Sequence, residues 1–80
     1  MFFVYILQSQ NDLEKIYVGV TTDLKQRLTE HNSGKSHHTD KYKPWVLKTY
    51  TAFPGKDIAY EFEKYLKSGN GRLFLKKRLL

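Results

Sequence analysis

The chain has 80 residues, enough for one domain with one small hydrophobic core. Hydrophobic residues make up 40% of it and aromatic residues 15%, which favours a folded protein, and the absence of cysteine excludes disulfides and thiolate metal sites. A net charge of +6 favours a polyanionic partner, most often nucleic acid; a basic solvated surface without such a partner is the alternative.

The N-terminal segment is apolar: residues 2–8 form a near-continuous run with aromatic and β-branched members. Such a run predicts a strand that is buried on both faces of a sheet. It lacks a basic start, ends at Gln8, and is too short to span a bilayer or to form the core of a signal sequence. We therefore expect a cytoplasmic protein with no membrane partner.

A second strand is predicted over residues 15–21, after a polar loop typical of a hairpin. A loop symmetric about Asn11 would place Tyr5 opposite Tyr17, with both phenols on one face of the sheet. Gly19 would then leave a gap beside the tyrosines that a substrate could use. A slip of one residue in this register would put the two phenols on opposite faces.

The middle of the chain predicts one helix and a third strand. The helix covers residues 24–32, since Thr22 or Asp23 can cap its start and Gly34 can end it. A polar loop over residues 33–43 then leads to a strand over residues 45–51.

The C-terminal part predicts two helices. The first covers residues 57–68, and a turn at residues 69–71 separates it from a short basic helix over residues 72–80. The resulting order, ββα-β-αα, predicts an α+β fold with a small antiparallel sheet of about three strands and two or three helices packed on it. We expect residues 1–80 to form this single domain.

Three charged or titratable side chains fall within apolar helical stripes. Glu63 lies among Ala59, Phe62 and Leu66, and Arg27 and His31 lie beside leucines on the first helix. A charge at a core-facing position is costly unless it is paired or coordinates a ligand. The alternatives are a stripe edge, where the charged group reaches water, and a structural ion pair between Glu63 and Arg27.

A series of short motifs runs along the chain: Phe3-Val4-Tyr5, Tyr17-Val18-Gly19-Val20-Thr21, Asp23-Leu24, Arg27-Leu28, His31-Asn32, Pro44-Trp45, Ala59, Glu63-Lys64, Leu66-Lys67 and Gly71-Arg72. In their order and spacing, these motifs resemble the GIY-YIG endonuclease family, and most closely its small stand-alone members, akin to the nuclease domain of the excision-repair endonuclease. The resemblance covers about residues 2 to 78. The chain departs from the name-giving letters by apolar replacements in the strands, and both tyrosines are kept.

The resemblance implies an endonuclease that hydrolyses phosphodiester bonds in DNA, with structured or damaged DNA among its candidate substrates. It implies one divalent metal ion, Mg²⁺ or Mn²⁺, held by Glu63 and bound weakly without substrate, and no small-molecule cofactor. A lone carboxylate suits Mg²⁺, which keeps several waters and takes further ligands from phosphate. Arg27 would donate to the phosphate oxygens through its planar fork of N–H groups.

The attacking water needs a base, and the candidates are Tyr5, Tyr17 and His31. A free phenol has a pKa near 10, so it needs help from nearby cations to act at neutral pH. The metal and Arg27 are suitable cations, and we favour a tyrosine, with the second tyrosine and His31 positioning the water. Which tyrosine takes the proton stays open, and ordinary strand packing is the alternative role for both.

Several other polar residues are candidate contacts to nucleic acid: Lys35, Lys43, Asn70 and Arg72. The basic residues of the C-terminal tail, Arg72, Lys76, Lys77 and Arg78, can border a phosphate or form a solvated helix face. A zinc site at His31, His37 and His38 is disfavoured, because no cysteine supports it and adjacent side chains in an extended loop point opposite ways. The alternative function is a nucleic-acid-binding module that does not cut, or a nuclease component that depends on a partner, such as another repair or recombination protein. RNA as the substrate stays open.

Overall fold

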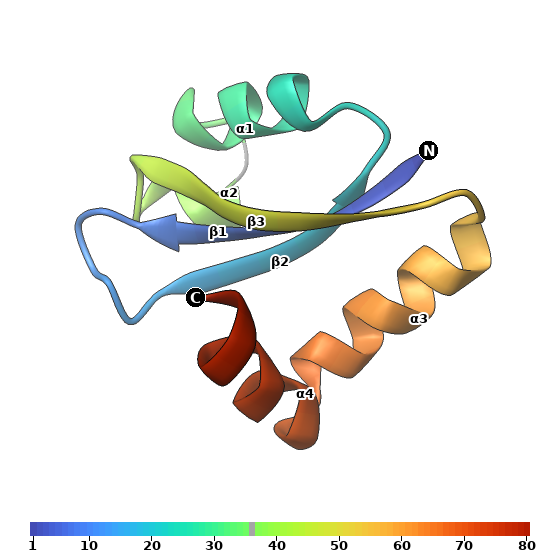
Figure 1. Ribbon diagram of the computed structural model, residues 1–80. Helices are drawn as coiled ribbons and strands as arrows, with labels where there is room; N and C mark the ends of the chain where they lie inside the picture. The colour runs from blue at the N-terminus through green and yellow to red at the C-terminus, as the bar shows by residue number, and fades with distance from the viewer. Residues whose placement is uncertain (36) are drawn as a thin grey trace.

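The computed structural model describes residues 1–35 and 37–80, with residues 37 and 38 described by their backbone alone. Three antiparallel strands, β1 (Phe2–Ser9), β2 (Ile16–Thr21) and β3 (Trp45–Phe53), form one sheet in the order β2-β1-β3. Figure 1 shows helix α1 (Leu24–Asn32) on one face of this sheet and helix α3 (Lys56–Lys67) on the other. The predicted α+β fold and its element order are confirmed.

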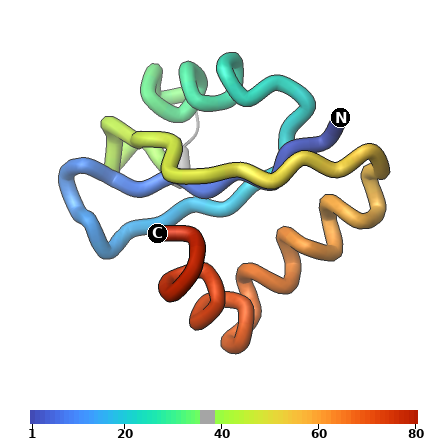
Figure 2. Tube along the Cα trace, in the orientation of Figure 1, coloured from blue at the N-terminus to red at the C-terminus, as the bar shows by residue number. Residues whose placement is uncertain are grey.

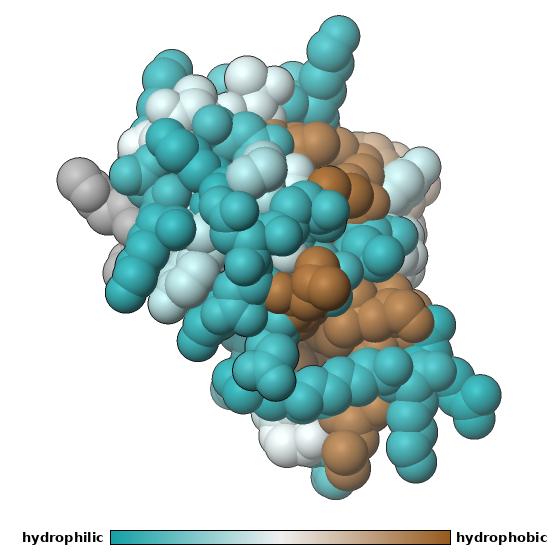
Figure 3. Space-filling view, turned by 90° about the vertical axis from the view of Figure 1, so that its left-hand side faces the viewer, coloured by the Kyte–Doolittle hydropathy of each residue, from teal (hydrophilic) through white to brown (hydrophobic). Residues whose placement is uncertain are grey.

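Two short segments complete the second face of the sheet. Helix α4 (Gly69–Phe74) follows α3 after a sharp bend and continues into a π-helical turn, η1 (Leu75–Leu79), which brings the C-terminus back under the sheet (Figure 2). No helix of the described residues is long and apolar enough to cross a membrane. Figure 3 shows one side of the molecule, with hydrophobic side chains gathered between an upper and a lower hydrophilic region.

The central strand β1 is buried on both faces, as the apolar run predicted. Its side chains alternate between two hydrophobic clusters, because successive residues of a strand point to opposite sides. Tyr5 and Leu7 pack with Trp45 beneath α1. The second cluster, on the side of α3, contains the buried residues Val4, Ile6, Val18, Ala59, Leu66 and Leu75.

The register of the β1–β2 hairpin differs by two residues from the predicted one. Tyr5 pairs with Gly19, and Leu7 pairs with Tyr17. The loop is centred on Asp12, whose carbonyl accepts a hydrogen bond from the Lys15 N–H at 2.9 Å and whose own N–H donates to Ser9 Oγ. A shift of two residues keeps every side chain on its face, so both tyrosines still lie on the α1 side.

The predicted gap at Gly19 is filled by the ring of Tyr5. A Cβ atom at Gly19 would lie 2.5 Å from the Tyr5 hydroxyl oxygen, because the two residues are direct cross-strand partners. The glycine therefore seats the phenol and leaves no room for a substrate beside it. The expectation of an open gap was wrong, since it depended on the register that the Asp12-centred loop displaces.

The boundaries of α1 follow the predicted signals. The Asp23 carboxylate accepts from the Gln26 N–H at 3.0 Å, and Gly34 adopts a φ of +84° just beyond the Ser33 cap. The segment predicted as a polar loop contains a short helix, α2 (His37–Asp40). The Thr39 carbonyl accepts from the indole N–H of Trp45 at 2.8 Å, a contact with the core that the local composition does not encode.

The predicted turn at residues 69–71 is instead the first part of α4. The hydroxyl of Ser68 caps this helix by accepting from the Gly71 N–H at 3.2 Å. Gly71 is buried, and a Cβ atom there would overlap the backbone carbonyl of Tyr65. Gly71 therefore permits the two helices to meet at a close bend, whereas the sequence pattern predicted a turn.

We expect Gly71→Ala to destabilise the protein by about 3 kcal/mol, because the added methyl group overlaps fixed backbone. Gly69→Ala is the matched control, since nothing lies within 4 Å of a Cβ at that position. It should be neutral or stabilising by up to about 1 kcal/mol, because alanine is the better helix former. Urea unfolding of the two variants measures the difference, and equal stabilities would contradict the bend geometry.

Candidate functional site

The phenol, guanidinium and imidazole groups predicted to act together meet at one hollow. This cavity, of about 250 Å³, opens between α1 and the edge strand β2 and is lined by Tyr17, Arg27, Glu30, His31 and Lys35. Tyr17 comes from β2, and the other side chains come from α1 or the turn that follows it. We call it the tyrosine hollow.

Tyr5 lies beneath the tyrosine hollow and belongs to a buried chain of hydrogen bonds. Its hydroxyl oxygen lies 3.0 Å from His31 Nε2, and His31 Nδ1 lies 2.8 Å from Thr39 Oγ1. The Tyr17 ring packs against the imidazole, with 4.6 Å between ring centroids. These contacts fix the imidazole in one orientation, with one face covered by the Tyr17 phenol.

Burial shifts both groups of this chain toward their neutral forms. Burial, with a smaller contribution from Tyr17, raises the pKa of Tyr5 above its ordinary value of 10.0, although the charge of Arg27 opposes the shift. Burial, followed by the charge of Arg27, lowers the pKa of His31 from its ordinary value of 6.5. At neutral pH the imidazole therefore accepts a hydrogen bond at one nitrogen and donates at the other.

The lowered pKa of His31 predicts a loss of stability in mild acid. The unfolded chain binds this proton more tightly than the folded chain, so the stabilisation is complete above about pH 6.5 and declines as the pH falls toward the folded pKa. His31→Gln should remove this part of the decline. Urea unfolding at several pH values between about 7.5 and 5, where most carboxylates stay ionised, gives the slope of the unfolding free energy against pH for the wild type and for His31→Gln. Equal slopes would contradict a buried neutral imidazole.

Arg27 is held by its neighbour on α1. Its Nε lies 3.2 Å from the Glu30 carboxylate, and both side chains are partly exposed at the rim of the tyrosine hollow. The ion pair uses one edge of the guanidinium and orients the group toward the hollow. The alternative of an Arg27–Glu63 ion pair is excluded, since each residue pairs within its own helix.

Glu63 lies on α3, across the sheet from the tyrosine hollow. It stands between Ala59 and Leu66 on the stripe that faces the sheet, and its side chain is 20% exposed. Its Oε2 is 3.1 Å from the Lys67 ammonium group. The structure therefore brings Tyr17, Arg27 and His31 to one hollow, with Tyr5 beneath it, and places Glu63 outside that lining.

Glu63 is linked to the tyrosine hollow through the edge strand. Its ion-pair partner, Lys67, lines a second cavity on the α3 side of β2, and Tyr17 belongs to the walls of both cavities. Helix α3 packs directly against β1 and β2. The Glu63–Lys67 pair and the tyrosine hollow therefore lie on opposite faces of the same edge strand.

The four predicted nucleic-acid contacts lie in different places. Lys35 lines the tyrosine hollow, and Arg72 lines the second cavity on the α3 side of β2. Lys43 forms an ion pair with Asp40 at 2.8 Å, and Asn70 is exposed on α4. Of the three histidines considered for zinc, His31 bonds to Tyr5 and Thr39, and the side chains of His37 and His38 lie outside the described residues.

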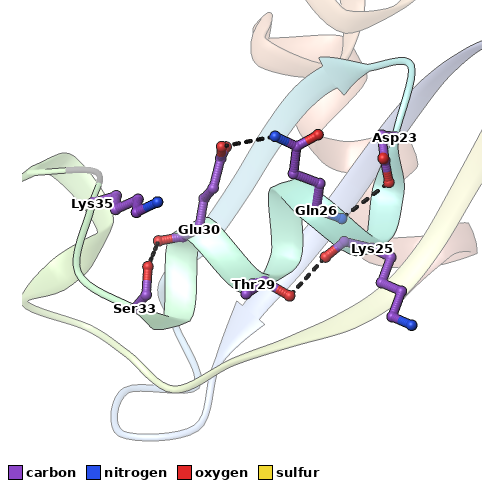
Figure 4. A pocket seen from close by; sticks show the side chains of 7 residues that line it. All are labelled: Asp23, Lys25, Gln26, Thr29, Glu30, Ser33 and Lys35. Atoms are coloured by element: carbon purple, nitrogen blue, oxygen red, sulfur yellow. Dashed lines mark hydrogen bonds between the residues drawn. The ribbon is translucent and has the colours of Figure 1, made fainter.

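A third hollow lies on the outer side of α1 and shares only Glu30 and Lys35 with the tyrosine hollow. Figure 4 shows its polar lining, in which Asp23 accepts from the Gln26 backbone and Gln26 reaches toward Glu30. These are capping and intrahelical contacts. Tyr17 and His31 are absent from its lining, so we assign it no role in the site.

Two residues of the site were not predicted from the sequence. Glu30 orients Arg27. Its position three residues after Arg27 on the predicted helix indicates an ion pair between the two side chains, so it could have been found from the sequence. Thr39 supports His31 from α2, in a segment predicted to be a loop, and no local pattern marks it.

Few of the described side chains near the site could bind a metal ion. Among the described residues no group of three or more His, Asp or Glu side chains is arranged to hold a metal. The carboxylate of Glu63 alone suits a hydrated Mg²⁺ that takes its remaining ligands from water and phosphate. Such an ion would have to replace the Lys67 ammonium group at the carboxylate.

This chain is similar to one protein family in sequence and in structure. The model of the family described as GIY-YIG catalytic domain matches residues 1–78. The UPF0213 protein SpyM50708 of Streptococcus pyogenes serotype M5 (strain Manfredo) is 35% identical over 71 residues, covering 88% of this chain and 75% of that protein. The UPF0213 protein SpyM3_1077 of serotype M3 has the same identity and coverage. The solution NMR structure of the UPF0213 protein BH0048 from Bacillus halodurans is 33% identical, with a TM-score of 0.57 over 96% of this chain and 84% of that one.

Proposed function

The chain belongs to the family of GIY-YIG catalytic domains, and from this premise we propose that it is a divalent-metal-dependent endonuclease that hydrolyses phosphodiester bonds in DNA. The observation that carries the proposal is the tyrosine hollow, where a phenol, a guanidinium and an imidazole converge on a chain of net charge +6. This set supplies a water-activating group and a phosphate-binding cation at one place.

We assign the phosphate to Arg27 and the attacking water to Tyr17. Arg27 stands at the rim of the hollow with its Nε paired to Glu30, and its planar guanidinium carries further N–H groups that can donate to non-bridging oxygens. Burial raises the pKa of Tyr5, which disfavours that phenol as the base. Tyr17 lines the hollow directly, and the neutral imidazole of His31 supports its ring.

Glu63 is the residue proposed to hold the metal ion. Bound there, Mg²⁺ or Mn²⁺ would stabilise negative charge on the phosphate and on the leaving oxygen. The protein contributes a partly buried carboxylate on α3, a helix that packs against β2, and Lys67 forms an ion pair with that carboxylate when no metal is bound. This arrangement agrees with weak metal binding in the absence of nucleic acid.

Tyr17→Phe should lower the cleavage rate about a hundredfold, because the general base is lost while the ring contact with His31 stays. Tyr5→Phe is the comparison, since it removes a buried hydroxyl that bonds to His31 but does not line the hollow. It should cost about 1–3 kcal/mol of stability and much less activity. Rates at saturating DNA, measured with unfolding curves, separate the two phenols; a larger rate loss in Tyr5→Phe would reverse the assignment.

The test of the proposed function is cleavage by the purified chain of supercoiled, branched and single-stranded DNA, with Mg²⁺, with Mn²⁺ and with a chelator. We expect metal-dependent cutting of at least one form, and its loss in Glu63→Ala. Cutting that survives both Glu63→Ala and Arg27→Ala, or no cutting of any form, would refute it.

A second candidate function is a nucleic-acid-binding module that does not cut alone. The observation that favours it is the position of Glu63, paired with Lys67 and outside the lining of the tyrosine hollow. Salt-dependent binding of duplex DNA without cleavage in either metal would support this function. If the chain cuts DNA only after a repair or recombination protein is added, it is one component of a partner-dependent nuclease.

A further inference from the structure

The second cavity, on the α3 side of β2, is lined by cations that the proposed chemistry does not use. It measures about 420 Å³, and its charged lining consists of Lys15, Lys67, Arg72 and Lys76 against one acid, Glu14. We call it the basic cavity. Four like charges around one hollow repel one another, which is unfavourable unless an anion enters.

Two of these cations, Arg72 and Lys76, make neither an ion pair nor a cation–π contact within the part of the chain that the structure describes. The other two have neighbours: Lys67 pairs with Glu63, and the Lys15 ammonium lies 5.3 Å from the centre of the Tyr42 ring. Arg72 and Lys76 are four residues apart, so they project from the same side of the C-terminal helical segment.

The basic cavity is built on the hydrophobic core. Its floor includes Val18, Leu66 and Leu75, each at most 8% exposed. Leu75 stands between the two unpaired cations, so its burial fixes the segment that carries them. The cations therefore stand on a fixed wall, which lowers the entropic cost of binding an anion.

We propose that the basic cavity is a second phosphate subsite, which binds the DNA backbone next to the phosphate held in the tyrosine hollow. The identification of the anion as DNA rests on the proposed function, whereas the anion site itself does not. Tyr17 is a wall of both cavities, and β2 has a paired strand on one side only. A backbone that crosses the free edge of β2 thus reaches both hollows at once, and Arg72 and Lys76 fix the direction in which it leaves.

The test uses two double variants that change the same charge on the same segment. Arg72→Glu with Lys76→Glu replaces two of the four cations of the basic cavity, whereas Lys77→Glu with Arg78→Glu changes exposed neighbours outside its lining. Binding is measured without divalent metal, by fluorescence anisotropy of a short labelled DNA duplex and, separately, of a labelled single-stranded RNA, each over a salt series. Circular dichroism confirms that each variant is folded.

We expect the cavity variant to bind roughly tenfold or more weakly than the control variant at equal salt, and its log–log salt slope to fall in magnitude by about 1.8, as for two lost phosphate contacts. Equal losses in both variants would overturn the subsite, because net charge alone would then explain binding. A selective loss with single-stranded RNA but not with duplex DNA would also overturn it.

This experiment is independent of cleavage. A selective loss of binding in a chain that never cuts DNA supports the subsite and refutes the proposed function. Cutting of DNA by the wild type, together with equal binding by both double variants, supports the proposed function and overturns the subsite.

Discussion

Replacement of Glu63 by glutamine is expected to lower Mg²⁺-dependent DNA cleavage by roughly a thousandfold, because loss of about 4 kcal/mol of charge stabilisation by the metal corresponds to that factor. Glutamine keeps the size of the side chain and removes its charge. Since Glu63 makes a partly exposed ion pair with Lys67, the variant should lose at most about 1 kcal/mol of stability. Initial rates at saturating DNA and Mg²⁺ measure the effect.

Lys67→Gln is the matched control for this experiment. It breaks the same 3.1 Å ion pair but leaves the carboxylate in place. If Glu63 holds the metal, the rate at saturating DNA should stay within a few-fold of wild type, even though binding weakens through the basic cavity. Equal loss of rate in both variants would show that the ion pair, and not a metal, explains the importance of Glu63.

Arg27→Ala is expected to lower the cleavage rate by about a hundredfold to a thousandfold, the usual cost of removing one preorganised donor from a transition state. Its ion pair with Glu30 is partly exposed and contributes little to stability, so the fold should be retained. Arg27→Lys should recover only part of the rate, because an ammonium group lacks the planar fork. Single-turnover rates with supercoiled DNA measure both variants.

Glu30→Gln separates the two roles of the Arg27 side chain. It removes the ion pair on α1 and leaves the guanidinium at the rim of the tyrosine hollow. We expect a rate within about tenfold of wild type, since positioning by Glu30 is lost but the phosphate donor stays. A loss as large as that of Arg27→Ala would mean that the ion pair itself is what the activity requires.

Most of the fold could be predicted from short-range patterns in the sequence. The alternation and burial of β1, the Asp23 cap and the apolar stripe of α3 each follow from short-range physical chemistry, and the structure confirms the elements built on them. The register of the hairpin could not be predicted in this way. It is set by hydrogen bonds to the Asp12 carbonyl and the Ser9 hydroxyl, which centre the loop on Asp12, and the composition of the loop does not indicate these bonds.

The site shows the same division between local and long-range information. Tyr17, Arg27 and His31 converge because a strand leads at once into a capped helix, which the sequence predicts. The role of Thr39 depends on a contact from α2 to His31, and the bend at Gly71 depends on two helices meeting at backbone distance. Such contacts join segments whose individual patterns say nothing about one another.

The most direct test of the account is the metal specificity of cleavage on DNA with sulfur in place of one non-bridging oxygen at its phosphates. Mg²⁺ strongly prefers oxygen ligands, whereas Mn²⁺ accepts sulfur more readily. If Glu63 holds a metal that contacts the scissile phosphate beside Arg27 and Tyr17, wild type should cut this DNA slowly with Mg²⁺ and recover with Mn²⁺. The recovery should vanish in Glu63→Gln and persist in Arg27→Lys. Equal rates with both metals in the wild type, or recovery in Glu63→Gln, would contradict the account.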